Sequence, residues 1–179
     1  MFLFGRGYRK KGLDILLAAC LLLKQRNYSF KLLIAGLREK FIDRWQLNAF
    51  DLSDNVHYLG VVKDMAQVYQ AGSIIALPSR IEPFGMSALQ AMSYGLVPVV
   101  SKIAGVAELL QNDTDSLVLE NHLNREELAS KLAFLLDNPQ KLKTMSKAAL
   151  VKAQAIDWQG TIDSTLNAYQ QIFQKRYVY

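Results

Sequence analysis

Residues 73–100 read SIIALPSRIEPFGMSALQAMSYGLVPVV, which is two short apolar runs with a helical stretch between them. The apolar runs are Ser73–Leu77, which a proline follows, and Val97–Val100. Phe84–Tyr94 has the length and composition of a helix, and the glycine directly behind it is typical of a helix C-terminus. A strand, a helix and a second strand in this order predict a parallel βαβ unit.

The same alternation of strands and helices extends from this unit in both directions. Further strands are expected at Met1–Phe4, Phe30–Ala35, Val56–Leu59 and Ser116–Leu119. Helices are expected at Gly12–Arg26, Arg38–Leu52, Met65–Tyr69 and Val106–Gln111, and then in succession at Asn124–Leu136, Pro139–Ala155 and Trp158–Phe173. We therefore expect one α/β domain with a doubly wound, Rossmann-like parallel sheet in three α/β/α layers. Its six-stranded core covers about residues 1–123, and a helical tail covers about 124–179.

The amino-acid composition favours a folded domain and excludes several kinds of disulfide and metal site. The chain has 179 residues, 51% of them hydrophobic and 21% charged, which is typical of a folded domain. Its longest apolar run, Ile15–Leu23, is much shorter than the roughly 20 residues that a membrane span needs. The single cysteine, Cys20, excludes an internal disulfide and a multi-cysteine metal site. With only His57 and His122, the chain has no histidine-rich metal centre either.

The formal net charge of +5 is concentrated near the N-terminus, because residues 1–44 hold ten Lys/Arg against three Asp/Glu. Such an excess can indicate a nucleic-acid-binding protein. These charges are scattered along the expected helix faces, however, and no motif with interleaved aromatic residues accompanies them. We therefore expect no nucleic-acid partner, and only the group at residues 6–11 is dense enough to suggest a binding site.

In doubly wound sheets, ligands bind beyond the carboxyl ends of the strands. The loop after the first expected strand, FGRGYRKKG at residues 4–12, is neither a Walker A loop nor a GxGxxG fingerprint. It instead places several cations where an anion would bind. Arg9 and Lys10 are interpreted as solvated charges, whereas Arg6 and Lys11 adjoin glycines at the loop boundaries and are candidate anion ligands.

The loop that begins at Pro78 carries Glu82 shortly before a helix begins near Phe84–Gly85. The start of a helix presents unpaired backbone N–H groups that favour phosphate. Glu82 is either a ligand-binding group or a charge that satisfies the helix dipole. Gln90 lies about two turns into the helix, and it either faces the same cleft or is an ordinary surface residue.

Three motifs carry a resemblance to a known family: GR followed by KG in the first loop, PSxxEPFGxxxxQAMxxGxxPVV, and AGVAEL. Together they resemble the C-terminal, donor-binding domain of retaining glycosyltransferases of family 4 (glycosyl transferases group 1), which have the GT-B architecture. The resemblance covers nearly the whole chain. It implies that residues 1–179 form one half of a GT-B fold and that the N-terminal, acceptor-binding half is absent from this chain.

The resemblance also implies roles for individual residues. Arg6 and Lys11 would neutralise the donor diphosphate as it leaves, and Glu82 would contact the donor sugar as the first glutamate of an E-x7-E motif. Gln90 departs from the family, which has a second glutamate there that grips the ribose. The implied substrate-binding residues are Gly5, Gly36, Leu37, Val61, Val62, Pro83, Phe84, Gly85, Met86, Ser87 and Gln90, with the backbone of 84–87 on the phosphates and residues 36–37 and 61–62 on the base.

The implied activity is hexosyl transfer from a UDP-, GDP- or ADP-sugar to a glycolipid or polysaccharide acceptor, with retention of configuration and with neither a metal nor another cofactor. Lipopolysaccharide and capsule enzymes belong to the same group. The resemblance implies a cytoplasmic protein whose full-length form can associate peripherally with the inner face of the membrane, and a fragment that is inactive without its N-terminal half. Two alternatives stay open: a sugar-nucleotide-binding module without transferase activity, and a sugar-nucleotide epimerase of the same architecture.

The last expected helix carries an apolar stripe at helical spacing, formed by Trp158, Ile162, Leu166, Tyr169, Ile172 and Phe173. We expect the domain's own sheet to cover part of this stripe. The remainder, toward Tyr169–Tyr179, should be exposed or pack against a second copy.

Overall fold

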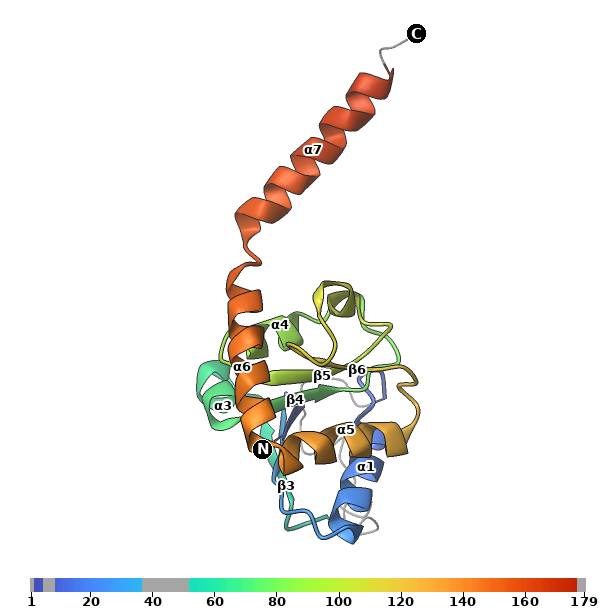
Figure 1. The fold of residues 1–179 in the computed structure, drawn as a ribbon, viewed down its shortest axis with the longest axis vertical. Helices are drawn as coiled ribbons and strands as arrows, with labels where there is room; N and C mark the ends of the chain where they lie inside the picture. The colour runs from blue at the N-terminus through green and yellow to red at the C-terminus, as the bar shows by residue number, and fades with distance from the viewer. Residues whose placement is uncertain (1, 5–8, 37–51, 177–179) are drawn as a thin grey trace.

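The computed structural model describes residues 2–4, 9–36 and 52–176 (Figure 1). The helix expected at Arg38–Leu52 lies almost wholly outside these residues. The strands are β1 (Phe2–Phe4), β2 (Leu32–Ala35), β3 (Val56–Gly60), β4 (Ile74–Leu77), β5 (Val97–Ser101) and β6 (Leu117–Leu119). The helices are α1 (Leu13–Gln25), α3 (Met65–Ala71), α4 (Met86–Met92), the 3₁₀-helix η2 (Gly105–Leu109), α5 (Arg125–Asp137), α6 (Pro139–Gln154) and α7 (Trp158–Arg176).

The six strands form one parallel sheet in the order β3-β2-β1-β4-β5-β6. Leu3 in β1 pairs with Leu33 of β2 on one side and with Ile75 of β4 on the other. The chain thus winds outward first in one direction from β1 and then, from β4, in the other. The predicted doubly wound sheet is confirmed, and its topological switch point lies between β1 and β4.

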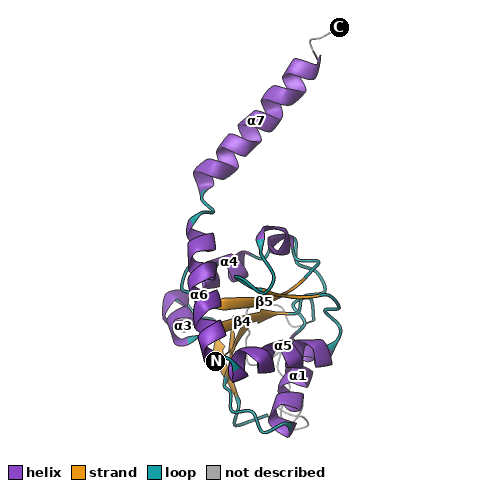
Figure 2. Ribbon diagram, viewed as in Figure 1, coloured by secondary structure: helices purple, strands orange, loops and turns teal. Residues whose placement is uncertain are grey.

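Each face of the sheet has its own hydrophobic core, because alternate residues of a strand point to opposite faces. Ile74 and Ala76 of β4 pack into the core that α1 and α5 cover. Ile75 and Leu77 pack into the other core, under α3 and α4. Figure 2 shows the strands between these helical layers, which gives the three layers that the sequence predicts.

Helices α5 and α6 are integral parts of the packed domain. Asn124 caps α5 by accepting hydrogen bonds from the backbone N–H groups of Glu126 and Glu127. In α6, Met145 is buried in the core shared with α1 and α5, while Ala149 packs with α4. This helix therefore joins the two helical layers, and within the segment expected to be a tail only α7 leaves the domain.

Helix α7 extends away from the domain (Figure 1), and every side chain from 159 to 174 is exposed. Its apolar residues are about half exposed, from 47% at Ile162 to 59% at Phe173. The expectation that the sheet covers part of the stripe is therefore wrong for these residues. The three-residue linker after α6, residues 155–157, carries the helix past the end of the sheet, so the side chains of 159–174 stay exposed among the described residues. Of the described helices, none combines the length and the hydropathy that crossing a membrane requires.

We expect this chain on its own to self-associate through α7, because large exposed apolar surfaces are uncommon on monomers. Sedimentation velocity at rising concentration measures this. Leu166→Glu combined with Phe173→Glu should abolish the association, whereas Ser164→Glu, on the opposite face of the helix, should not. Strictly monomeric behaviour of the unmodified chain at every concentration would contradict the prediction.

Candidate functional site: the edge between β1 and β4

Two segments meet where β1 and β4 end side by side. The first is residues 9–12, before α1, and the second is the loop from Pro78 to Gly85 that follows β4. The carbonyl of Lys10 accepts hydrogen bonds from the backbone N–H groups of Arg80 (2.8 Å) and Ile81 (3.3 Å). Gly12 makes the closest approach, since a Cβ at its left-handed φ of +75° would lie 1.9 Å from the carbonyl oxygen of Pro78. The switch point thus brings together the two loops that the sequence singles out.

Lys11 and Glu82 form an ion pair across this junction, between Nζ and Oε2. The two residues are 71 positions apart in the chain. The side chain of Glu82 is 7% exposed and that of Lys11 is 24% exposed. The structure therefore brings together two of the three predicted catalytic residues. The Glu82 carboxylate has a specific cationic partner in Lys11, beyond any general interaction with a helix dipole.

The pair lies in the wall of a hollow of about 420 Å³. The described residues of its lining are all predicted site residues: Lys11, Glu82, Pro83, Phe84, Gly85, Met86 and Ser87. The Oγ atom of Ser87 is buried there and has no hydrogen-bond partner within the described chain. An ammonium group and a hydroxyl that can still donate are the groups that an anionic, oxygen-rich ligand would need.

The turn that forms this hollow is held from behind by the loop after β5. The backbone N–H of Val106 donates to the carbonyl of Phe84 at 2.6 Å, and that of Gly105 donates to the carbonyl of Glu82 at 3.4 Å. Gly85 has a φ of +108°, and a Cβ there would lie 2.8 Å from a methyl group of Val106. The AGVAEL motif therefore supports the site through hydrogen bonds of its backbone.

Ser101 is fully buried at the end of β5, and it fixes the beginning of the loop that follows β4. Its hydroxyl lies 2.8 Å from the carbonyl of Ser79 and 3.3 Å from that of Leu77. A buried hydroxyl that is hydrogen-bonded to backbone carbonyls can hold a turn in place without the free-energy cost of an unpaired polar group. Sequence reasoning missed Ser101, although a serine at the end of an otherwise apolar strand is a signal that could have identified it.

The described residues among those predicted to contact the base, Gly36, Val61 and Val62, lie at the same edge of the sheet but do not line the hollow. Gly36 follows β2 and donates its N–H to the carbonyl of Gly60 at 2.6 Å, which joins the ends of β2 and β3. Val61 is 70% exposed, and Val62 packs against the core under α3 and α4. Gly5, Arg6 and Leu37 lie outside the described residues.

Gln90 does not line the hollow. It is exposed on α4, where its Oε1 accepts a hydrogen bond of 3.4 Å from the hydroxyl of Tyr69 on α3. Burial and the neighbouring Tyr94 raise the pKa of Tyr69, so this hydroxyl stays protonated and able to donate. The position is thus a helix-to-helix contact that spacing along the chain could not reveal.

Sequence reasoning also missed an ion pair beside the hollow, between Arg80 and Asp14 in the first turn of α1. Two bonds of 2.7 Å join the guanidinium to the carboxylate. Partial burial alone would raise the pKa of the Asp14 carboxyl, but the hydrogen bonds and charge of Arg80 outweigh it, so the pKa lies below the ordinary value. No local motif signals a pair whose members are 66 positions apart.

Among the described residues, no group of three or more His, Cys, Asp or Glu side chains could hold a metal ion. Of the described residues that line the hollow, the charged ones are Lys11 and Glu82.

A family model for glycosyl transferases group 1 matches residues 1–151 of the chain. A D-inositol 3-phosphate glycosyltransferase from Segniliparus rotundus is 27% identical over 177 residues, which cover 93% of this chain and 38% of that protein. The chain thus spans less than half the length of this relative.

Solved structures share the fold. The C-terminal domain of the glycosyl transferase group 1 protein LpcC from Francisella tularensis is similar with a TM-score of 0.75 and 18% identity, over 86% of this chain and 83% of that one. The Anabaena protein HepE, solved in complex with UDP-glucose, is similar with a TM-score of 0.77 and 22% identity, over 95% of this chain and 48% of that one.

The close approach at Gly12 predicts a large and specific loss of stability. Gly12→Ala should lower the free energy of unfolding by roughly 3 kcal/mol or more, because it combines left-handed strain with a clash against backbone. Gly60→Ala is the matched control, since its φ is +63° but a Cβ there meets nothing within 4 Å. We expect that control to cost about 1 kcal/mol in urea unfolding. Equal losses would show that the approach of the two loops is loose.

Proposed function

The chain belongs to the glycosyl transferases group 1 family, and from this premise we propose that it is the donor-binding domain of a glycosyltransferase that uses a nucleoside diphosphate-sugar. The observation that carries the proposal is the Lys11–Glu82 pair in the wall of the hollow at the switch point of the sheet. An ammonium suits a diphosphate and a carboxylate suits sugar hydroxyls, and here they lie together. That the related fold of HepE binds UDP-glucose supports the same ligand class for this hollow.

In the proposed reaction, the bond between the anomeric carbon and the diphosphate oxygen breaks, and its electron pair stays on the diphosphate. A bond forms between the anomeric carbon and an acceptor hydroxyl oxygen, and the proton of that hydroxyl passes to the departing diphosphate oxygen. Lys11, with Arg6, stabilises the charge that develops on the leaving diphosphate, a gain that is largest in the transition state. Glu82 orients the donor sugar by accepting from its hydroxyls. The family 4 assignment, retention of configuration and transfer of a hexose complete the proposal.

The proposed acceptor site lies in a further half of the protein that this chain does not contain. The extent of the matches supports this, because the chain spans less than half of the D-inositol 3-phosphate glycosyltransferase and of HepE. The domain of LpcC, matched over 83% of its length, is a C-terminal one. The exposed stripe of α7 offers that half a surface to pack on. Alone, the chain should bind the donor and transfer little or nothing.

The remaining parts of the proposal concern the donor, the acceptor and the setting. The donor is a UDP-, GDP- or ADP-sugar, the acceptor is a glycolipid or polysaccharide, and the protein is cytoplasmic, with contacts to the inner face of the membrane. No metal or other cofactor takes part, because Lys11 and Arg6 supply the positive charge that a metal would otherwise bring to the diphosphate.

A second candidate is a sugar-nucleotide-binding module without transferase activity. It is favoured by Gln90, which stands where the family has its second glutamate and which contacts Tyr69 instead of the hollow. An amide can both donate and accept, but it lacks the charge that strengthens hydrogen bonds to a ribose diol. A sugar-nucleotide epimerase of the same architecture remains the third candidate.

We expect nucleoside diphosphates to stabilise the chain more than monophosphates, since Lys11 faces the hollow. A ligand that binds only the folded state adds RT ln(1 + [L]/Kd), or about 2.7 kcal/mol at a hundredfold excess over Kd. Thermal shifts with UDP, GDP, ADP and the matching monophosphates, each with and without EDTA, measure this. Equal shifts for the two classes, or shifts that EDTA removes, would overturn the metal-free diphosphate site.

The proposed role of Glu82 predicts that its loss affects UDP-glucose and UDP differently. Glu82→Gln should weaken binding of UDP-glucose about tenfold, the loss of one charge-assisted hydrogen bond, but should not weaken binding of UDP. UDP loses no hydrogen-bond partner, because it carries no donor sugar. Calorimetry with Glu108→Gln as the matched control, an exposed glutamate on η2, makes the comparison. If UDP and UDP-glucose weaken equally, Glu82 does not contact the sugar. Gln90→Glu should change the affinity of both ligands alike if it reaches the ribose.

A further inference from the structure

Arg80 connects the loop after β4 to the segment around Lys11 through both its backbone and its side chain. Its N–H donates to the carbonyl of Lys10 at 2.8 Å. Its guanidinium donates to the carbonyl of Arg9 at 2.9 Å and to both carboxylate oxygens of Asp14 at 2.7 Å. The partners of this one residue therefore flank Lys11 on both sides along the chain. Arg80 itself stands two positions before Glu82.

The pair has the geometry of a rigid connection. Two parallel N–H···O bonds between a guanidinium and a carboxylate fix orientation as well as distance. The pKa of Arg80 is raised, first by its hydrogen bond to Asp14, and the pKa of the Asp14 carboxyl is lowered, so both groups stay charged over the working pH range. Side-chain exposures of 32% and 36% place the pair at the surface, where water weakens its contribution to overall stability.

Arg80 does not line the hollow, and its charge is already matched by Asp14. An effect of Arg80 on a ligand would therefore pass through Lys11. The side chain of Lys11 has a flexible stem, and its place opposite Glu82 requires that the backbone of residues 9–14 be held in register with the loop at 80–82.

We propose that Arg80 and Asp14 are positioning residues that hold Lys11 against Glu82 and thereby set the affinity of the hollow for a diphosphate. The inference about affinity rests on the proposed function, whereas the inference about the position of Lys11 does not. Holding a charged group in place before the ligand arrives removes the cost of ordering it on binding.

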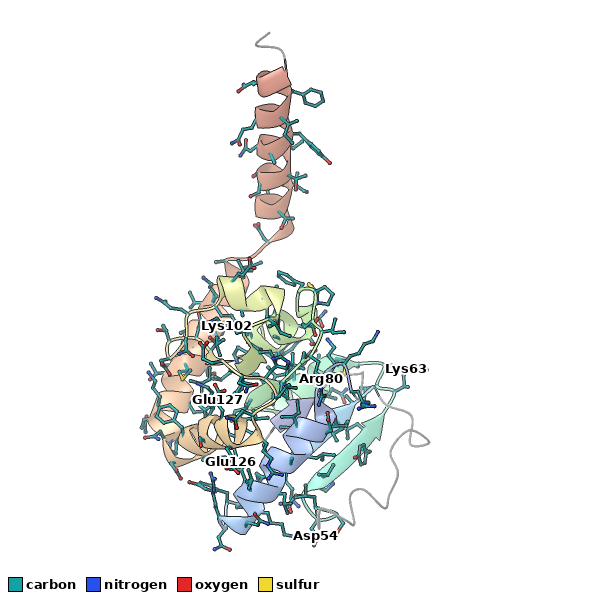
Figure 3. The ribbon with its side chains drawn as sticks, turned by 90° about the vertical axis from the view of Figure 1, so that its right-hand side faces the viewer. Asp54, Lys63, Arg80, Lys102, Glu126 and Glu127 are labelled. Atoms are coloured by element: carbon teal, nitrogen blue, oxygen red, sulfur yellow. The ribbon has the colours of Figure 1, made fainter. Side chains whose placement is uncertain are left out.

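An internal control exists at the other end of α1. Arg26 donates to Glu126 on α5 at 2.9 Å, and both side chains are about half exposed. Figure 3 shows Arg80 and Glu126 at separate places on the globular part of the molecule. This second pair also joins α1 to another element, but its loss should leave the segment around Lys11 unchanged.

The test measures the reactivity of the Lys11 amine with trace acetic anhydride, by mass spectrometry, relative to the exposed Lys63 of the same chain. Arg80→Gln and Asp14→Asn should each raise it about tenfold, because the Lys11 side chain, only 24% exposed in the pair, becomes accessible to the reagent once its flexible stem is free to leave Glu82. The double variant should raise the reactivity of Lys11 no further than either change alone, since the two residues act as one unit. Arg80→Lys should give Lys11 an intermediate reactivity, because it keeps the positive charge but loses the two-bond contact that a guanidinium makes with a carboxylate. Arg26→Gln should change nothing.

Unchanged reactivity of Lys11 in folded Asp14→Asn would overturn the proposal, and this variant decides the matter if Arg80→Gln does not fold. Calorimetry on the same variants tests the link to affinity, with about a fivefold weaker Kd for UDP expected in Asp14→Asn and no change in Arg26→Gln. If Lys11 becomes reactive but the unmodified chain binds no nucleoside diphosphate, the proposed function fails and the positioning role stands. If UDP binds equally well to all variants, the role in affinity is wrong.

Discussion

The carbonyl of Lys10, shared by the N–H groups of Arg80 and Ile81, is the contact on which the site depends. It joins two loops that lie far apart in the chain and that meet only because β1 and β4 are neighbours in a parallel sheet. Parallel strands end at the same edge, so whatever follows β1 is carried to whatever follows β4. The approach is so close at Gly12 that no other residue fits without moving the backbone. The Lys11–Glu82 pair is a consequence of that register.

The rest of the domain holds this edge in place. Two cores, one on each face of the sheet, fix the strands, and burial of apolar surface is the largest favourable term in such a fold. Behind the hollow, Ser101 and the backbone of Val106 hold the turn that carries Glu82 and Phe84. Polar groups at the edge therefore act on a scaffold that hydrophobic packing has already made rigid. This division explains why the candidate ligand groups can stand on loops and still be well positioned.

Periodicity and breaker residues predict nearly all the described elements, because a buried strand and an amphipathic helix leave different spacings in the sequence. The rule that ligands bind at the carboxyl ends of strands also predicts the loops of the site. The side-chain partners could not be predicted, since the Asp14–Arg80 pair depends on strand order and on the exact register of two loops. Gln90 illustrates the same limit, because its partner Tyr69 comes from a neighbouring helix. The sequence predicts the two helix boundaries around residues 155–157 closely, but the direction in which this linker sends α7 is not encoded by the spacing of apolar residues.

The most direct test is to locate the residues that a nucleoside diphosphate contacts when it binds. Titration of the isotopically labelled chain with UDP, followed by amide NMR shifts, locates the contact residue by residue. We expect saturable changes at residues 9–12 and 82–87, and their loss in Lys11→Ala. The hollow beside β6 and α5, lined by Asp113, Lys131 and Phe134 among others, should remain unaffected. Changes that centre there, or a complete absence of saturable shifts, would contradict the claim that the edge between β1 and β4 is the donor site.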